Sequence, residues 1–262
     1  MVSSTQSRRP GVALEPQATC LDVALERLGN RAIKEVTFQN YLRTLRLLGL
    51  EDVPFKEATV RFLANRLNTV LNPGTRRKHA INIRGALGVA VPCPRAQRRE
   101  YDLPELKEVH EAFANTNWRM HAFSMLYAGL RLGESCVKQP IKGTVLTVDR
   151  QRLLDKTVAA PKTTGPVHVP QWFAEEYAAY DDFDRHQTTV YKGIKAASRR
   201  AGLDINPHSL RHQFGTELVK AGASPEVLRR QMRHQDVTVS LQFYVETKAS
   251  DIADVMARFG ES

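Results

Sequence analysis

The chain has 262 residues, of which 42% are hydrophobic and 25% are charged. This mixture is typical of a globular protein with one large or two small domains, and it excludes a collagen-like or wholly disordered chain. No apolar run approaches the ~20 residues of a membrane-spanning helix, and the N-terminal residues lack the apolar stretch of a secretory signal. We therefore expect a soluble cytoplasmic protein without membrane contact. Cys20, Cys93 and Cys136 are far apart and odd in number, which favours free thiols over disulfides or a zinc site.

The charge is positive and unevenly distributed. The chain has 38 Lys and Arg against 28 Asp and Glu, a net charge of +10. The first 100 residues hold 17 basic and 8 acidic side chains, a net charge of +9, so the rest of the chain contributes only +1. A basic N-terminal part indicates a polyanionic partner, with a basic surface that merely aids solubility as the alternative.

The N-terminal part has the pattern of a small helical domain. Residues 1–14 have the composition of a flexible basic tail, and residues 15–92 have the apolar spacing of four amphipathic helices. We expect these helices over 21–29, 38–48, 55–71 and 75 to about 90. The fourth begins with a basic turn, where the helix dipole favours acidic residues, so its charges are interpreted as contacts for an external anion or as solvated surface charges. Residues 93–102 combine proline and arginine with little to bury, which is typical of an interdomain linker.

The remaining residues, 103–262, predict a second domain that is mostly helical with a small sheet. Helices are expected over 103–114 and 118–128, and short strands over 144–148 and 167–169. Further helices are expected over 172–180, 188–201, 209–220, 225–233, 239–244 and 249–259. The predicted fold class is therefore mainly α, with two domains.

Four stretches of this second domain carry a motif series. Residues 126–134 read LYAGLRLGE, 160–170 read APKTTGPVHVP, 207–216 read PHSLRHQFGT, and 228–234 read LRRQMRH, ten residues before Tyr244. In this order they resemble the first arginine box, the lysine-bearing β-hairpin, the His-x-x-Arg helix and the second histidine with its nucleophilic tyrosine in the tyrosine recombinase, or phage integrase, family. The resemblance covers residues 103 to about 259, and the basic helical unit ahead of it matches that family's core-binding domain in size and position.

The resemblance implies a fold, an activity and a set of partners. The fold would be an N-terminal four-helix core-binding domain and a catalytic domain with a small antiparallel β-sheet, together encircling a duplex. The activity would be site-specific recombination through a 3′-phosphotyrosyl intermediate, serving phage integration and excision, with resolution of the Xer or plasmid type as an alternative. The partners would be double-stranded DNA at core attachment sites, a homotetramer on two duplexes formed from a protein that is monomeric without DNA, and a directionality factor. The protein would then associate with the nucleoid of a bacterial host.

The same resemblance assigns catalytic roles residue by residue, and the chemistry of each side chain fits its role. Arg131 and Arg211 would hold the nonbridging oxygens of the phosphodiester through forked hydrogen bonds, with Glu134 holding Arg131 by a helical ion pair. Tyr244 would attack as the nucleophile once neighbouring cations or a base activate its phenol. Three further residues would complete the site: Lys162 as general acid, with Lys156 in reserve; His208 in proton transfer or phosphate binding; and His234 on a nonbridging oxygen. No cofactor is needed, because the phosphotyrosyl bond retains the energy of the bond that was broken.

The DNA interface is predicted from charge alone. Lys and Arg contacts to phosphates would supply most of the affinity, and helix side chains in the major groove would read bases. The candidate DNA-binding residues are Arg76, Arg77, Lys78, Asn82, Arg84, Arg95, Arg98 and Arg99.

Two departures from the family pattern concern the segment before Tyr244. The family usually has Leu-Gly-His where this chain has Met232-Arg233-His234, and the extra charge of Arg233 is expected to contact DNA or to loosen the turn. The ten-residue step to Tyr244 is one longer than in many members.

Only about 100 residues precede the second domain, which would make this the short type that lacks an arm-binding domain.

Three other functions compete with this interpretation. His208 and His212 have the i, i+4 spacing of a helical zinc pair, but the adjacent Arg211 would repel a cation and no third ligand follows, so no metal site is predicted and His212 is expected to pack locally. A metal-dependent nuclease would need clustered carboxylates that the sequence lacks. A non-catalytic DNA-binding regulator and a topoisomerase remain as alternatives.

The C-terminal residues predict one more helix. The helix over 249–259 is expected to pack on a neighbouring protomer or on its own domain.

Overall fold

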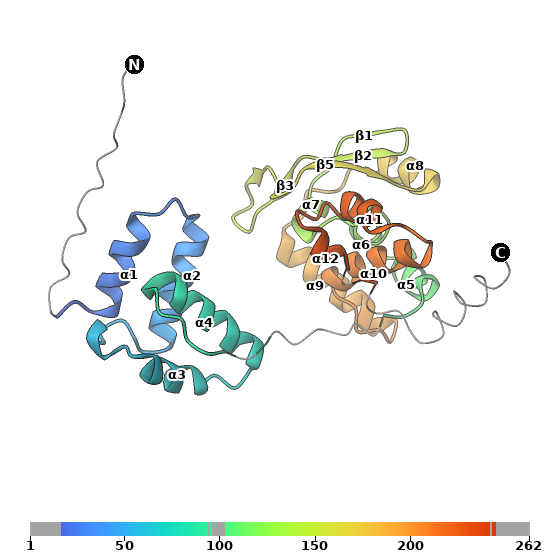
Figure 1. The fold of residues 1–262 in the computed structure, drawn as a ribbon. Coiled ribbons are helices and arrows are strands. Elements are labelled where there is room, and N and C mark those ends of the chain that lie inside the picture. The colour runs from blue at the N-terminus through green and yellow to red at the C-terminus, as the bar shows by residue number, and fades with distance from the viewer. Residues whose placement is uncertain (1–16, 94, 96–102, 242, 245–262) are drawn as a thin grey trace, which may run out of the picture. The chain divides into compact units, whose positions relative to one another are not determined.

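The computed structural model describes residues 17–93, 95, 103–241 and 243–244. The chain divides after Glu100 into two compact units (Figure 1). Within the described residues each unit has a hydrophobic core of its own. The expected tail over 1–14 and the expected helix over 249–259 lie outside these residues. None of the described helices is long and apolar enough to cross a membrane.

The N-terminal unit contains the four helices that its apolar spacing predicts. They are α1 (Cys20–Gly29), α2 (Glu35–Leu47), α3 (Val60–Asn68) and α4 (Pro73–Leu87), with one 3-10 turn, η1 (Phe55–Glu57), before α3. Leu45, Leu63 and Ile83 lie fully buried at the centre of their core. Helices α2 and α4 approach closely where Gly85 of α4 faces Tyr41 of α2. A Cβ atom on Gly85 would lie 2.6 Å from the Tyr41 ring.

The helix expected over 55–71 is shorter in the structure, where it is α3 alone. The hydroxyl of Thr59 accepts a hydrogen bond from the backbone N–H of Phe62 (3.2 Å), so α3 begins only after this cap and η1 stays separate from it. The fourth helix also ends earlier than expected, at Leu87, because Gly88 adopts a left-handed conformation (φ 77°) that terminates α4. Local caps, which apolar spacing does not report, set both boundaries.

The C-terminal unit is mostly helical, as predicted. Its helices are α5 (Leu106–Ala114), α6 (Arg119–Ala128), α7 (Leu132–Ser135), α8 (Gln171–Ala179), α9 (Gln187–Arg200), α10 (Pro207–Lys220), α11 (Pro225–Met232) and α12 (Val237–Leu241). The short helix α7 was not expected from the sequence. Helix α12 begins and ends earlier than the expected helix over 239–244.

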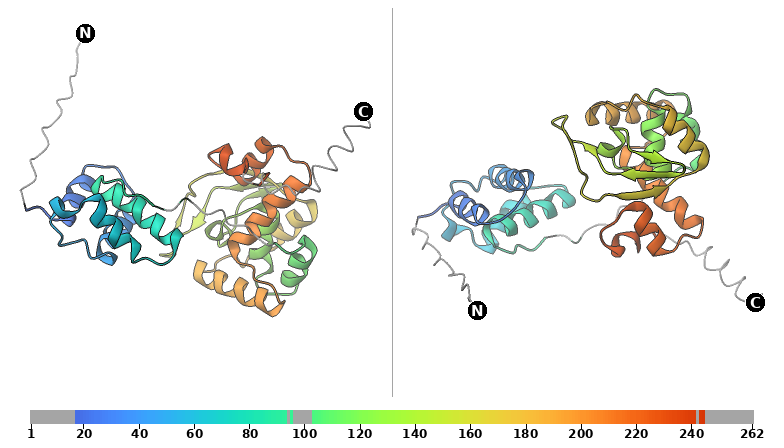
Figure 2. Two further views of the ribbon diagram at one scale, coloured as in Figure 1. Left: turned by 60° about the horizontal axis from the view of Figure 1, so that its bottom comes forward. Right: turned by 90° about the horizontal axis from the view of Figure 1, so that it is seen from above.

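Short antiparallel strands lie along one side of these helices (Figures 1 and 2). Strands β1 (Ile141–Lys142), β2 (Val145–Val148) and β5 (Gly165–His168) form a sheet of order β1-β2-β5, and β3 (Gln151–Arg152) pairs with β4 (Val158–Ala159). Leu146 lies opposite Val167 in the β2–β5 register, and both side chains are fully buried. One face of the sheet therefore packs on the core. Residues 160–164 form the β4–β5 loop, which leads into β5.

Helices α6 and α10 pack against each other at the centre of this unit. Helix α6 ends at Gly129, which has a left-handed φ of 58°. A Cβ atom on this glycine would lie 2.5 Å from the ring of Phe214 on α10, so only glycine fits both the backbone conformation and the contact. This contact brings the residues after α6 beside the first turns of α10.

Candidate active site

Arg131 is placed by the turn that ends α6. Leu130 is fully buried, and the chain then turns into α7, with Arg131 as the residue before its first turn. The carboxylate of Glu134 accepts hydrogen bonds from the Arg131 backbone N–H (2.8 Å to Oε2) and from its Nη1 (2.8 Å to Oε1). Glu134 is fully buried and the Arg131 side chain is 37% exposed, so the guanidinium is held from behind while its outer part faces solvent. The expected ion pair is present.

Arg211 is placed by α10 and lies against the same turn. Asn206 caps this helix through hydrogen bonds from the backbone N–H groups of His208 (2.9 Å) and Ser209 (3.1 Å). One turn further, the Arg211 guanidinium donates to the backbone carbonyls of Gly129 and Met232. Arg211 is only 5% exposed, so these two carbonyls fix its position inside the unit.

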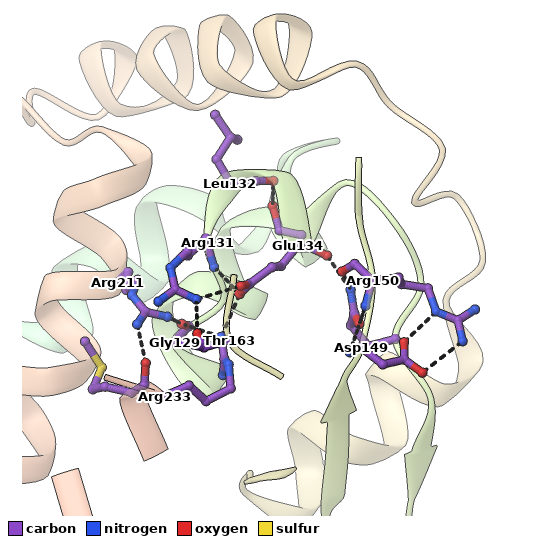
Figure 3. A network of polar contacts seen from close by, with 12 residues as sticks. Gly129, Arg131, Leu132, Glu134, Asp149, Arg150, Thr163, Arg211 and Arg233 are labelled. Atoms are coloured by element: carbon purple, nitrogen blue, oxygen red, sulfur yellow. Dashed lines mark hydrogen bonds and ion pairs between the residues drawn. The ribbon is translucent and has the colours of Figure 1, made fainter. Parts of the chain in front are cut away.

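Arg233, the residue before the second histidine, joins this pair of arginines. Its Nη2 donates to Glu134 Oε2 at 2.6 Å and lies 3.5 Å from the carbonyl oxygen of Gly129, which also accepts from Arg211. Figure 3 shows the three guanidinium groups gathered around Glu134 and Gly129. Burial, followed by the positive charges of Arg131 and Arg233, lowers the pKa of Arg211 to about 9. The cluster therefore disfavours its own positive charge, and an anion would relieve this cost.

His234 follows directly and lies within the field of this cluster. Its Nδ1 atom is 2.9 Å from the hydroxyl of Ser240 on α12, and its backbone N–H donates to the carbonyl of Arg229. Burial, and after it the charges of Arg211, Arg131 and Arg233, lower the pKa of His234 to about 4. The imidazole is therefore neutral at neutral pH.

The other two histidines of the motif differ in their surroundings. His208 is exposed in the first turn of α10, three residues before Arg211. The ring of His212 packs against Phe243 with ring centroids 4.5 Å apart, and its Nδ1 is 3.5 Å from the Thr216 hydroxyl. Within the described ranges no three His, Cys, Asp or Glu side chains gather in a metal-binding group.

Lys162 is exposed in the β4–β5 loop, and this loop is hydrogen-bonded to Arg131. The neighbouring residue, Thr163, accepts a hydrogen bond from Arg131 Nη1 (3.0 Å). The loop that carries Lys162 is therefore attached to the arginine cluster. Lys156, the reserve candidate, lies in the turn between β3 and β4 with a left-handed φ of 73°.

Tyr244 has a backbone partner outside the arginine cluster. Its hydroxyl donates to the carbonyl of Ala223, in the turn between α10 and α11. Burial raises the pKa of Tyr244, whereas close guanidinium groups would lower it. In this conformation the Tyr244 hydroxyl therefore binds Ala223, and its role as the nucleophile stays a prediction.

For Arg233, the structure contradicts one of the two expectations, contact with DNA. Its side chain is 2% exposed and binds Glu134, so in this conformation it lies in the interior and not on a DNA-facing surface. It occupies the position after α11 with a left-handed φ of 51°, a conformation that glycine adopts without cost. The signal in the sequence was the arginine in place of the family's glycine, but its ion-pair partner, 99 residues away, was not evident.

Some candidate DNA-binding residues of the N-terminal unit have exposed side chains, and others contact groups within the protein. Lys78, Arg84 and Arg95 are exposed. Arg76 donates twice to the carbonyl of Val70 (2.8 and 3.0 Å). Of the other arginines, Arg77 is half-buried near Cys93, and Arg98 and Arg99 lie outside the described residues.

Asn82 does not fit the expected role in base reading. It is buried, with 8% exposure, and its side-chain amide donates to the Thr44 hydroxyl (2.8 Å) and to the carbonyl of Asn40 (3.3 Å). The amide therefore joins α4 to α2, because a buried polar group needs such partners.

Part of this chain resembles known proteins in sequence. A model of the phage integrase family matches residues 183–250. Tyrosine recombinase XerA of Saccharolobus solfataricus is 23% identical over 173 residues, which cover 63% of this chain and 59% of that protein. Tyrosine recombinase XerD of Corynebacterium glutamicum is 39% identical over 64 residues, 24% of this chain and 21% of that protein. The matches thus span less than two thirds of the length of these curated relatives.

Solved structures resemble a larger part of the chain. The Tn1549 transposon integrase in complex with a circular intermediate DNA has a TM-score of 0.73 at 14% identity, covering 92% of this chain and 99% of that one. A lambda integrase dimer bound to a COC′ core site has a TM-score of 0.62 at 18% identity, covering 86% and 93%. This likeness shows the fold, which is that of the tyrosine recombinases. Together with the match of the family model to residues 183–250 and with the curated relatives, it supports the tyrosine recombinase family for this chain.

Proposed function

We propose that this protein is a site-specific DNA recombinase that cuts and rejoins DNA strands through a 3′-phosphotyrosyl intermediate on Tyr244. The observation that carries the proposal is the convergence of Arg131, Arg211 and His234, from three distant segments, beside the loop of Lys162. Two guanidinium groups and a neutral imidazole suit a phosphodiester whose nonbridging oxygens gain charge during attack.

Each side chain has a role in the proposed reaction. Arg131 and Arg211 hold the nonbridging oxygens of the scissile phosphate. With the Ser240 hydroxyl donating to its Nδ1, neutral His234 carries its hydrogen on Nε2 and donates it to one of these oxygens. His208 accepts the proton that the Tyr244 phenol loses, and Lys162 delivers a proton to the leaving 5′-oxygen. The phenolic oxygen of Tyr244 bonds to phosphorus as that 5′-oxygen leaves, and a 5′-hydroxyl of another strand reverses the step.

The proposed reaction requires Tyr244 to leave Ala223. The hydrogen bond to the Ala223 carbonyl, which contributes about 0.5–1.5 kcal/mol, would have to break when DNA binds. The proposed partners are double-stranded DNA at core sites and three further copies of the chain on two duplexes, with a directionality factor as an additional partner. Integration and excision of phage DNA is the proposed biological role, and resolution of the Xer or plasmid type is the alternative within the same chemistry.

Covalent capture on DNA of random sequence tests this proposal. The protein is incubated with nicked duplexes of randomised sequence, and adducts that survive denaturation are recovered and sequenced. We expect the wild type to form adducts at an enriched sequence in the presence of EDTA, and Tyr244→Phe to form none while still binding that sequence. Adducts formed equally by Tyr244→Phe, or abolished by EDTA, would contradict the proposal.

A DNA-binding regulator without catalytic activity is the second candidate. The hydrogen bond of the Tyr244 hydroxyl to the Ala223 carbonyl favours it. A regulator would bind the enriched sequence and form no adduct even with the wild type. Joining of two differently marked duplexes separates a recombinase from a topoisomerase that uses the same chemistry.

A further inference from the structure

Arg233 has a backbone conformation that its own residue type does not favour. Lys156 and Arg233 are the non-glycine residues with positive φ among those that the structure describes. Lys156 lies in an exposed hairpin turn, whereas Arg233 is 5% exposed and ends α11. A bulky residue persists in the left-handed region only where its surroundings hold it there. The ion pair with Glu134 is the contact that holds Arg233.

The guanidinium of Arg233 is incompletely satisfied. Its Nη2 binds Glu134, but its buried Nε and Nη1 atoms have no hydrogen-bond partner in the described part of the chain. Buried guanidinium nitrogens without partners are unfavourable, so a purely structural role would be better served by an apolar side chain or by glycine. The arrangement therefore points to a requirement for positive charge at this position.

The charges of the cluster do not balance. Arg131, Arg211 and Arg233 carry three positive charges around the single buried carboxylate of Glu134, which leaves an excess of two. Arg131 uses Nη1 on Glu134 and Thr163, while its Nε and Nη2 donate to no described residue. Arg233 binds the Oε2 atom of the same carboxylate and so neutralises part of the charge that would otherwise hold Arg131.

We infer that Arg233 is a positioning residue of the recombination site: it shares Glu134 with Arg131 and adds a third positive charge behind the two arginines that bind the scissile phosphate. This inference rests on the proposed function. A phosphodiester carries one negative charge and gains a second as the nucleophile adds, so an excess of two positive charges matches the transition state better than the ground state. Arg233 therefore acts on the rate of cleavage more than on DNA affinity.

Arg233→Gly is the main test, because glycine adopts a φ of 51° without strain. We expect the variant to bind the enriched duplex with the wild-type affinity and to form the covalent adduct about tenfold or more slowly at saturating DNA, the size of effect seen when a supporting residue of a site is removed. Arg233→Lys, which keeps the charge, should restore part of the rate. Arg230→Gln is the matched control, since Arg230 is on the same helix with its side chain 75% exposed and paired with Glu226.

Two further readouts separate charge from structure. Inorganic phosphate should bind more weakly to Arg233→Gly than to the wild type or Arg230→Gln, and the NMR titration midpoint of His234 should rise only in Arg233→Gly, since one nearby positive charge is lost. Wild-type adduct rate and phosphate affinity in a folded Arg233→Gly would overturn the inference. If Arg233→Gly does not fold, the affinity of Arg233→Lys for inorganic phosphate is the test. An affinity near the wild-type value supports the inference, and a tenfold loss overturns it. If the wild type forms no adduct, the proposed function fails, while phosphate binding still decides the role of Arg233.

Discussion

The guanidinium of Arg233 lies 2.6 Å from the carboxylate of Glu134, although the two residues are 99 positions apart in the sequence. Glu134 also binds Arg131 through its other oxygen, so a single buried carboxylate joins the turn after α6 to the end of α11. The arginine cluster therefore depends on one acidic side chain.

Replacing Glu134 by glutamine is expected to destabilise the C-terminal unit. The amide keeps the shape of the carboxylate but removes the charge that compensates Arg131 and the buried Arg233. Breaking a buried ion pair on one side costs about 3–5 kcal/mol, and we expect the free energy of unfolding in urea to fall by this amount. Glu226→Gln, which removes a carboxylate from two surface ion pairs on α11, should change little. Equal, small effects of the two substitutions would refute a central role for Glu134.

Gly129→Ala tests the turn that carries Arg131. The added Cβ atom would meet the Phe214 ring at 2.5 Å, and alanine would have to adopt a φ of 58°. The backbone cost of about 1 kcal/mol and the overpacking cost of about 1–3 kcal/mol together predict a loss of about 2–4 kcal/mol in the free energy of unfolding. Adduct formation should slow as well, because the Gly129 carbonyl accepts from Arg211.

Gly202→Ala is the matched control for this substitution. Gly202 has a φ of 74°, but a Cβ atom added there would meet nothing within 4 Å, so only the backbone cost of about 1 kcal/mol applies. If the two variants lose the same stability, as measured by urea unfolding, the contact with Phe214 does not determine the turn.

Motif chemistry predicted those parts of the site that short, local features specify. Arg211 is one turn after the capped start of α10, and Glu134 is three residues after Arg131, so both relationships follow from helix geometry. The strands at β2 and β5 were likewise visible in their apolar residues. In each case the information lies within a few residues of sequence.

The parts that were not predicted depend on contacts between distant segments. The position of the Tyr244 hydroxyl depends on a carbonyl 21 residues earlier, and Arg233 depends on a carboxylate 99 residues earlier. Asn82 looked like a polar residue on a basic helix, yet α2 covers it. Burial of a polar side chain is decided by tertiary packing, and spacing along one helix does not contain that information.

Lys162→Ala should slow cleavage in a way that a better leaving group reverses. General acid catalysis contributes about 10²–10⁴-fold, and we expect a loss of adduct rate in this range with an ordinary nicked duplex. With sulfur in place of the leaving 5′-oxygen the rate should recover, because a thiolate leaves without protonation. Lys156→Ala, in the β3–β4 turn, is the control and should keep the wild-type rate on both substrates. Failure of the sulfur substrate to restore Lys162→Ala would exclude Lys162 as the general acid.

His234 makes the stability of the fold depend on pH. Its pKa is about 4 in the folded protein, against about 6.5 for an unperturbed histidine. Between these values the unfolded chain binds a proton that the folded chain does not, so the free energy of unfolding should fall as the pH decreases from about 6.5 to 4 and should not depend on His234 titration above that range. Urea unfolding across this range should show a weaker pH dependence for His234→Gln than for the wild type. NMR titration of the His234 ring measures the pKa directly, and a midpoint near 6.5 would show that neither burial nor the three arginines lower the pKa of this imidazole.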